Sequence, residues 1–203
     1  ILKRDTAGLM NTMDSLLPQF DQNDINVIKW QLNTDNVNMS GIVYKCAYGY
    51  PAVILLKPYD INEASGEKKL NFMSVSNPLW LTCPFLNKKI HEFESFGYIR
   101  KITDFINSDR NLVDLMKNSH AHYYYLRKNL YCRTFGEISS IEFSNKILNA
   151  GIGGIREISN IKCLHQHYSH FQICPDNVAG RVIHNLLNGI NYCRERLCDD
   201  ASR

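Results

Sequence analysis

The sequence has no long apolar run and little net charge, and each absence excludes a class of protein. No stretch approaches the ~18 consecutive apolar residues of a membrane-spanning helix, and charged residues occupy the N-terminal segment, where a secretory signal would be apolar. The 23 Lys and Arg against 20 Asp and Glu leave a formal charge of +3, too little to attract nucleic acid by electrostatics alone. We therefore expect a soluble, cytoplasmic protein without membrane or nucleic-acid partners.

Closely spaced cysteine pairs are also missing. The seven cysteines are odd in number and are spread along 203 residues, a chain long enough to bury a core without covalent staples. This distribution predicts reduced thiols rather than a disulfide framework. Since no two cysteines have the CxxC spacing of common zinc sites, any metal site would have to collect its ligands from distant segments.

Hydrophobic periodicity predicts short helices at about 5–17 and 25–32, followed by a β-rich middle and a helical second half. Two apolar runs, 41–46 and 51–56, predict a hairpin, and 79–82 a third strand, with an exposed polar loop at 60–69 between them. Further helices are expected at 85–96, 98–106, 111–131, 162–170 and 178–197.

These elements predict an α+β fold, in which a small antiparallel sheet at about 41–82 packs against helices of the C-terminal half. A mostly helical bundle with one hairpin is the alternative. In terms of domains, we expect an N-terminal helical extension and loop at 1–40, a single α+β domain at 41–197 and a polar tail at 198–203.

The densest group of reactive side chains lies in residues 162–170, which hold one cysteine and three histidines. At about 100° per residue, a helix would place Cys163, His167 and His170 on one face and His165 on the opposite face. Thiolate and imidazole groups are zinc ligands. With Cys46 and Cys83 at the ends of expected strands, we predict a zinc site of Cys46, Cys83, Cys163 and His167, with His170 as a further candidate.

Three functional hypotheses follow from these residues and the neighbouring helices. A zinc site with four protein ligands would be structural, whereas one with a bound water would be hydrolytic. A thiol next to an imidazole is also a candidate nucleophile, so Cys163 and His165 are candidate catalytic residues, although buried free cysteines are common in cores. The third hypothesis is an interaction module without chemistry, in which the aromatic helix at 111–131 contacts an unknown protein partner.

A glycine-rich segment precedes the cysteine and histidine cluster. Backbone amides around Gly151, Gly153 and Gly154, together with Arg156, would form a site for an anionic or phosphorylated small ligand. The segment lacks the Lys and Ser/Thr of a phosphate-binding P-loop. A tight turn is the alternative interpretation.

Several of these motifs occur in the same order as in a known family. The chain resembles the bacterial family known as domain of unknown function 501, whose name implies no established activity. The similarity places Cys46, Cys83 and Cys163 in family motifs and therefore favours a shared site over scattered core thiols. The matching segments are Cys46-Ala47-Tyr48-Gly49-Tyr50-Pro51, Trp80-Leu81-Thr82-Cys83-Pro84-Phe85-Leu86, Ala150 to Gly154, Lys162-Cys163-Leu164-His165 with His167, and Asn177-Val178-Ala179-Gly180, where valine replaces the proline of the family's Asn-Pro-x-Gly.

Overall fold

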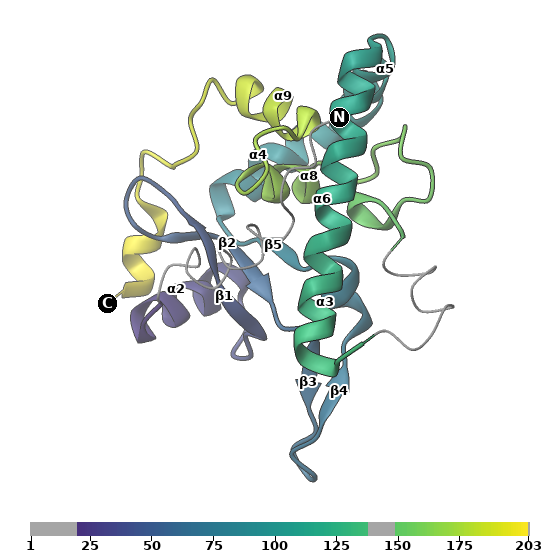
Figure 1. The fold of residues 1–203 in the computed structure, drawn as a ribbon. Coiled ribbons are helices and arrows are strands. Elements are labelled where there is room, and N and C mark those ends of the chain that lie inside the picture. Colours follow the sequence, from purple (N-terminus) through teal and green to yellow (C-terminus); the bar gives the residue numbers. More distant parts are fainter. Residues whose placement is uncertain (1–19, 138–148, 203) are drawn as a thin grey trace.

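The computed structural model describes residues 20–137 and 149–202 (Figure 1). A three-stranded antiparallel sheet lies at the centre, with strand order β1-β2-β5. Its strands are β1 (Met39–Lys45), β2 (Pro51–Leu56) and β5 (Leu79–Leu81). The predicted hairpin, third strand and α+β class are thus confirmed, and the helix predicted at 5–17 lies outside the described residues.

Strand β2 is buried along its whole length because both faces of the sheet are covered. Successive side chains of a strand point to opposite faces, and they accordingly enter two different hydrophobic clusters. Val53 and Leu55 contribute to the main core, whereas Ile54 and Leu56 pack with Ile28 of helix α2 (Gln22–Leu32).

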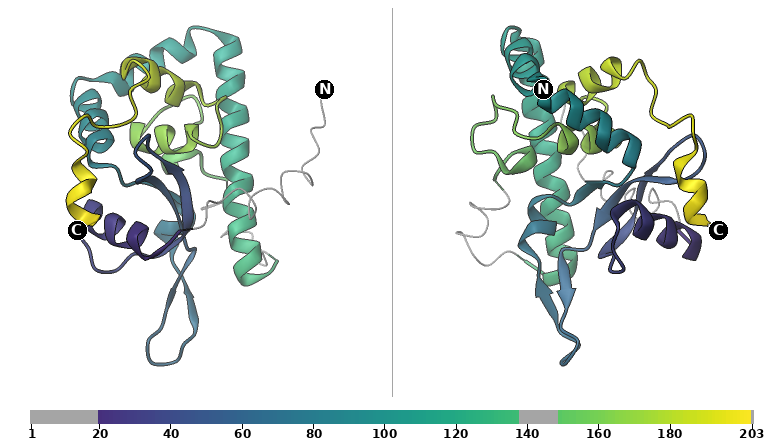
Figure 2. Two further views of the ribbon diagram at one scale, coloured as in Figure 1. Left: turned by 90° about the vertical axis from the view of Figure 1, so that its left-hand side faces the viewer. Right: turned by 180° about the vertical axis from the view of Figure 1, so that it is seen from behind.

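Helix α2 covers the face of the sheet opposite the main core. The C-terminal 3-10 helix η3 (Leu197–Ser202) lies next to α2 (Figures 1 and 2). Asp21 caps α2 by accepting from the amide of Asp24, whose carboxylate in turn accepts from the amide of Asp21. The Lys45 ammonium pairs with Asp24 at 2.7 Å. Parts of the expected extension and tail therefore pack with the sheet.

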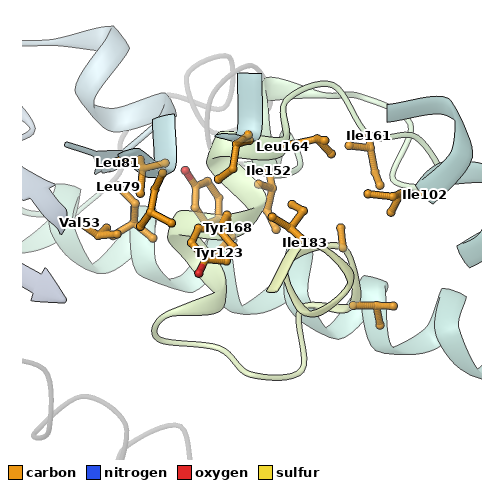
Figure 3. Packing of buried hydrophobic residues seen from close by; sticks show 14 of the residues in the cluster. Val53, Leu79, Leu81, Ile102, Tyr123, Ile152, Ile161, Leu164, Tyr168 and Ile183 are labelled. Atoms are coloured by element: carbon orange, nitrogen blue, oxygen red, sulfur yellow. The ribbon is translucent and has the colours of Figure 1, made fainter. Parts of the chain in front are cut away.

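The second half supplies the helices that form the main core. Helix α6 extends along one side of the molecule, and α8 lies between it and the sheet (Figure 1). Figure 3 shows Leu164 and Tyr168 of α8 with Tyr123 of α6 and Leu79 and Leu81 of β5. The helices are α4 (Pro84–Ser95), α5 (Tyr98–Asn107), α6 (Arg110–Phe135), α8 (Leu164–Phe171) and α9 (Val178–Leu186), with a 3-10 turn, η2 (Ile152–Gly154).

Two predictions of secondary structure were wrong. The expected loop at 60–69 contains a second hairpin, β3 (Tyr59–Ile61) with β4 (Lys68–Leu70), followed by the short helix α3 (Phe72–Ser76). The last helix ends at Leu186 instead of near residue 197. Asn188 and Gly189 have positive φ angles of 53° and 71°, and a left-handed backbone ends a helix.

Candidate metal centre beside helix α8

Cys163 lies just before helix α8 rather than inside it. It is the N-cap residue, with an extended backbone at φ −145° and ψ 116°. The helical alignment expected for Cys163, His167 and His170 therefore does not form. The Cys163 Sγ instead lies 4.0 Å from Nδ1 of His165, the histidine expected on the opposite side.

A carboxylate from helix α4 completes this group. The ligand atoms of Glu94, Cys163 and His165 all lie within 4.8 Å of one another, and Glu94 Oε1 is 3.2 Å from His165 Nδ1. The same oxygen accepts from the amide of Leu164 at 2.7 Å, which gives the first turn of α8 a partner that the helix cannot provide. The side chains of Glu94 and His165 are each 22% exposed, so the group is reachable from solvent.

The hydrogen-bond partner of His165 Nε2 determines which ring nitrogen is available as a metal ligand. His165 Nε2 lies 3.2 Å from the carbonyl oxygen of Asn87. A carbonyl can only accept, so Nε2 carries a hydrogen. A metal-bound histidine typically donates its other N–H to such an oxygen. His165 Nδ1, Glu94 Oε1 and Cys163 Sγ are therefore candidate ligand atoms for a cation.

The thiol of Cys163 is not prepared as a nucleophile. Burial raises its pKa, and the nearby Glu94 carboxylate adds to the increase. A catalytic cysteine needs the opposite shift. The contacts of Cys163 therefore fit a metal ligand, which loses its proton when the ion binds, better than they fit a free nucleophile.

A second group of ligand atoms lies deeper, between α6 and the end of α8. His122, His170 and Cys174 also have their ligand atoms within 4.8 Å of one another. His122 Nδ1 and His170 Nε2 are 2.9 Å apart. His170 is fully buried, and its ring lies edge-on to Tyr123 at 5.1 Å.

Asn177 determines which nitrogens of this second group carry hydrogen. It caps helix α9, and its Oδ1 accepts from the amide of Gly180 at 3.0 Å. This bond fixes the orientation of the amide, so Nδ2 donates to His170 Nδ1 at 3.0 Å and Oδ1 accepts from His167 Nδ1 at 3.3 Å. His170 must then donate from Nε2 to His122. A metal ion on that nitrogen would displace the hydrogen to Nδ1, where the Asn177 amide also donates.

Burial keeps these histidines neutral. It lowers the pKa of His167 to about 3 and that of His120 to about 4, and it lowers the pKa of His170 well below its usual value. His120 Nδ1 accepts from the amide of Ile152 at 3.1 Å. The buried group, which we call the histidine network, thus comprises His120, His122, His167, His170 and Asn177.

The four predicted zinc ligands do not form one compact cluster in the described part of the chain. Cys46 follows β1, and Cys83 is the N-cap of α4, where burial raises its pKa to about 12. His167 belongs to the histidine network, next to His120. Within 20–137 and 149–202, the clusters of three close ligand groups include Cys163 but not these three residues. Glu94 was missed because its position in the sequence gives no sign that it meets α8.

The glycine segment is a tight turn with most of its amides in use. Gly151 donates to the carbonyl of Ile155 at 2.6 Å, and Gly154 donates to that of Gly151 at 3.0 Å. Gly153 and Gly154 have positive φ angles of 73° and 75°, which glycine adopts without strain. Arg156 is exposed. The anion site there stays a prediction.

All residues of both clusters lie within the region that one family model matches. The family model described as a protein of unknown function, DUF501, matches residues 42–185. The chain belongs to the DUF501 family. This confirms the resemblance seen in the motifs. No curated protein and no solved structure matches the chain. In the described part of this DUF501 protein, no helix is long and apolar enough to cross a membrane.

Proposed function

We propose that this DUF501 protein binds zinc through Glu94, Cys163 and His165 and that the site is hydrolytic. One observation carries the proposal: the three ligand atoms lie within 4.8 Å of one another while His165 donates its remaining N–H to Asn87. Thiolate sulfur, imidazole nitrogen and carboxylate oxygen are all zinc ligands. The proposal retains Cys163 from the sequence-based set and replaces its other members.

The number of ligands favours hydrolysis over a structural role. Structural zinc sites are closed by four protein ligands, whereas catalytic sites use three and keep the fourth position for water. Zinc lowers the pKa of a bound water to about 7 and so supplies hydroxide at neutral pH. The partial exposure of Glu94 and His165 leaves a path for water and substrate.

Backbone groups of the protein orient two of the proposed ligands, His165 and Glu94. The Asn87 carbonyl fixes the tautomer and the ring direction of His165, and the Leu164 amide holds Glu94 Oε1 beside the ring. Both partners are backbone atoms. The ligand geometry is therefore held by helices α4 and α8 themselves and does not depend on further side chains.

Metal analysis provides the test. Protein purified without added metal should contain close to one equivalent of zinc, and Co²⁺ substitution should give the charge-transfer absorption of a cobalt thiolate. Cys163→Ser and His165→Ala should each lose the metal, whereas Cys132→Ser, a matched thiol variant on α6, should retain it.

Two further variants separate this site from the sequence-based one. Cys46→Ser and Cys83→Ser should keep the metal if Glu94, Cys163 and His165 bind it. If those two variants lose the metal and Glu94→Gln keeps it, the ligand set predicted from the sequence is correct. Less than about a tenth of an equivalent of zinc in the wild type, with none taken up on addition, would refute any zinc function.

A further inference from the structure

A cavity of 540 Å³ lies away from the proposed metal centre. It is bounded by the loop after α2, strands β2 and β5, the segment around α3, and Gln166 of α8. Its volume is in the range of cavities that hold small molecules. None of the side chains that line it, all within the described part of the chain, belongs to Lys, Arg, Asp, Glu or His. The cavity is therefore suited to an uncharged ligand.

The walls of the cavity combine apolar strand residues with one large aromatic ring. Ile54 and Trp80 are paired across β2 and β5, so they face the same side of the sheet. Trp80 is 51% exposed and Met73 is 74% exposed. A half-exposed indole presents a flat surface for stacking, and a flexible thioether adapts to the shape of a ligand.

Most amides around the cavity are already bonded within the protein. There are two exceptions. The exposed side-chain amide of Asn36 makes no hydrogen bond among the described residues, and Asn77 Oδ1 is buried without a hydrogen-bond partner there. A buried acceptor without a partner costs free energy. The bonded amides and their partners are Asn71 with the Ser74 amide and Asp60, Gln166 with the Leu79 carbonyl and the Tyr123 hydroxyl, and Asn38 with the Tyr59 carbonyl.

We infer that this cavity binds a neutral aromatic heterocycle, such as the nucleobase of a nucleoside. The ring would stack on the exposed indole of Trp80. A sugar fits less well, because each of its hydroxyls needs a partner when buried and most of the amides that could serve are already bonded. A phosphate would find no cation among the lining side chains.

The fluorescence of Trp80 provides a direct readout. The chain has two tryptophans, and Trp30 lies on α2, 43% exposed and outside the cavity lining. In a Trp30→Phe background, Trp80 is the only tryptophan. Adenosine, guanosine, cytidine and uridine should be titrated separately, and at least one should quench the signal saturably. Its triphosphate should bind no more tightly, and glucose should have no effect.

A cavity variant localises the binding, followed by calorimetry and thermal unfolding. Trp80→Ala should abolish it. Trp30→Ala, which removes an indole outside the cavity lining, is the matched control and should bind as the wild type does. Cys163→Ser should also bind normally, because Cys163 does not line the cavity.

The outcomes that would overturn the inference are distinct from failure of the zinc proposal. Absence of saturable quenching with all four nucleosides would refute it. Equal binding of the nucleoside by Trp80→Ala would place the ligand elsewhere and would also refute it. Trp80 is half exposed, so its replacement should leave the fold intact, and the thermal unfolding of Trp80→Ala checks this directly.

Discussion

The proposed metal centre and the histidine network both involve helix α8. One imidazole nitrogen faces a hydrogen-bond acceptor in the metal centre, whereas the corresponding partner in the network is a hydrogen-bond donor. In the metal centre, the far nitrogen of His165 meets a backbone carbonyl, which accepts a hydrogen. In the network, Nδ1 of His170 meets the amide group of Asn177, which donates one. Consequently Nδ1 of His165 is the nitrogen that would bind a cation, whereas Nε2 of His170 carries a hydrogen.

This difference separates two clusters that look alike by distance. Each brings three ligand groups within 4.8 Å, and a distance criterion alone would treat both as metal sites. The hydrogen-bond partners favour the more exposed group around Cys163 as the cation site, because Nε2 of His170 already donates to His122. The network is not fully paired, since Nε2 of His120 and Nε2 of His167 are buried without a hydrogen-bond partner among the described residues. We therefore expect the group around Cys163 to bind metal and the histidine network to stabilise the fold.

The largest expected effect, on the free energy of unfolding, follows from replacing Asn177, the central residue of the histidine network. Asn177→Ala removes the cap of α9 and two bonds to buried imidazoles, and we expect it to lower the free energy of unfolding by about 3 kcal/mol. Zinc content should be unchanged. Urea unfolding followed by circular dichroism, together with metal analysis, measures both quantities.

Asn177→Ser is the matched control, because serine still caps the helix and should recover about 1 kcal/mol of that loss. In the opposite direction, Cys163→Ser should lose zinc while the metal-free protein keeps nearly wild-type stability. Loss of zinc by Asn177→Ala under folding conditions would show that the two clusters are not independent.

The next effect concerns the pH dependence of zinc affinity. Since burial raises the pKa of Cys163, the thiol is protonated at neutral pH and must release its proton when zinc binds. Affinity should therefore rise about tenfold per pH unit up to the thiol pKa. Calorimetry between pH 7 and 8 in buffers of different ionisation enthalpy would detect the released proton. Binding without proton release would contradict thiolate ligation.

The histidine network should instead affect the pH dependence of folding. The pKa values of about 3 for His167 and about 4 for His120 lie below the ordinary value of 6.5, so the unfolded chain takes up protons first as the pH falls. Stability is full above pH 6.5 and should decrease towards pH 4, by about 1 kcal/mol per unit for each histidine. Urea unfolding at a series of pH values measures this slope.

His120→Asn keeps an acceptor for the Ile152 amide but does not titrate, so it should flatten the slope by about 1 kcal/mol per pH unit. His91→Asn, an exposed histidine on α4, should leave the slope unchanged. Equal slopes in the wild type and in His120→Asn would show that His120 is not buried in its neutral form.

The smallest expected effect concerns Val178, which replaces the proline of the family's Asn-Pro-x-Gly motif. Val178 is the first residue of α9, a position that favours proline because its amide has no partner within the helix. Val178→Pro should stabilise the protein by about 0.5 kcal/mol by restricting the unfolded chain, as measured by thermal unfolding. Val182→Pro, inside the same helix, should cost about 3 kcal/mol or more. Destabilisation by Val178→Pro would show that the packing of the valine outweighs the gain.

Much of the fold was accessible from local patterns. The hairpin of β1 and β2 and the helices α4 to α6 follow from apolar runs and spacings among neighbouring residues, and they were predicted correctly. The hairpin of β3 and β4 was not, because its polar sequence, 59–70, has the composition of a loop. The end of α9 depends on the left-handed backbone at Asn188, to which helical periodicity is insensitive.

The sequence by itself determined that one cysteine and three histidines gather in residues 163–170. Only the tertiary structure decided what they can bind. Glu94 and Asn87 reach His165 from α4, 71 and 78 residues away in the chain, and Asn177 reaches His170 from the start of α9. Hydrogen-bond partners assign each imidazole its free nitrogen, and such partners are set by packing between elements, which no local spacing in the sequence records.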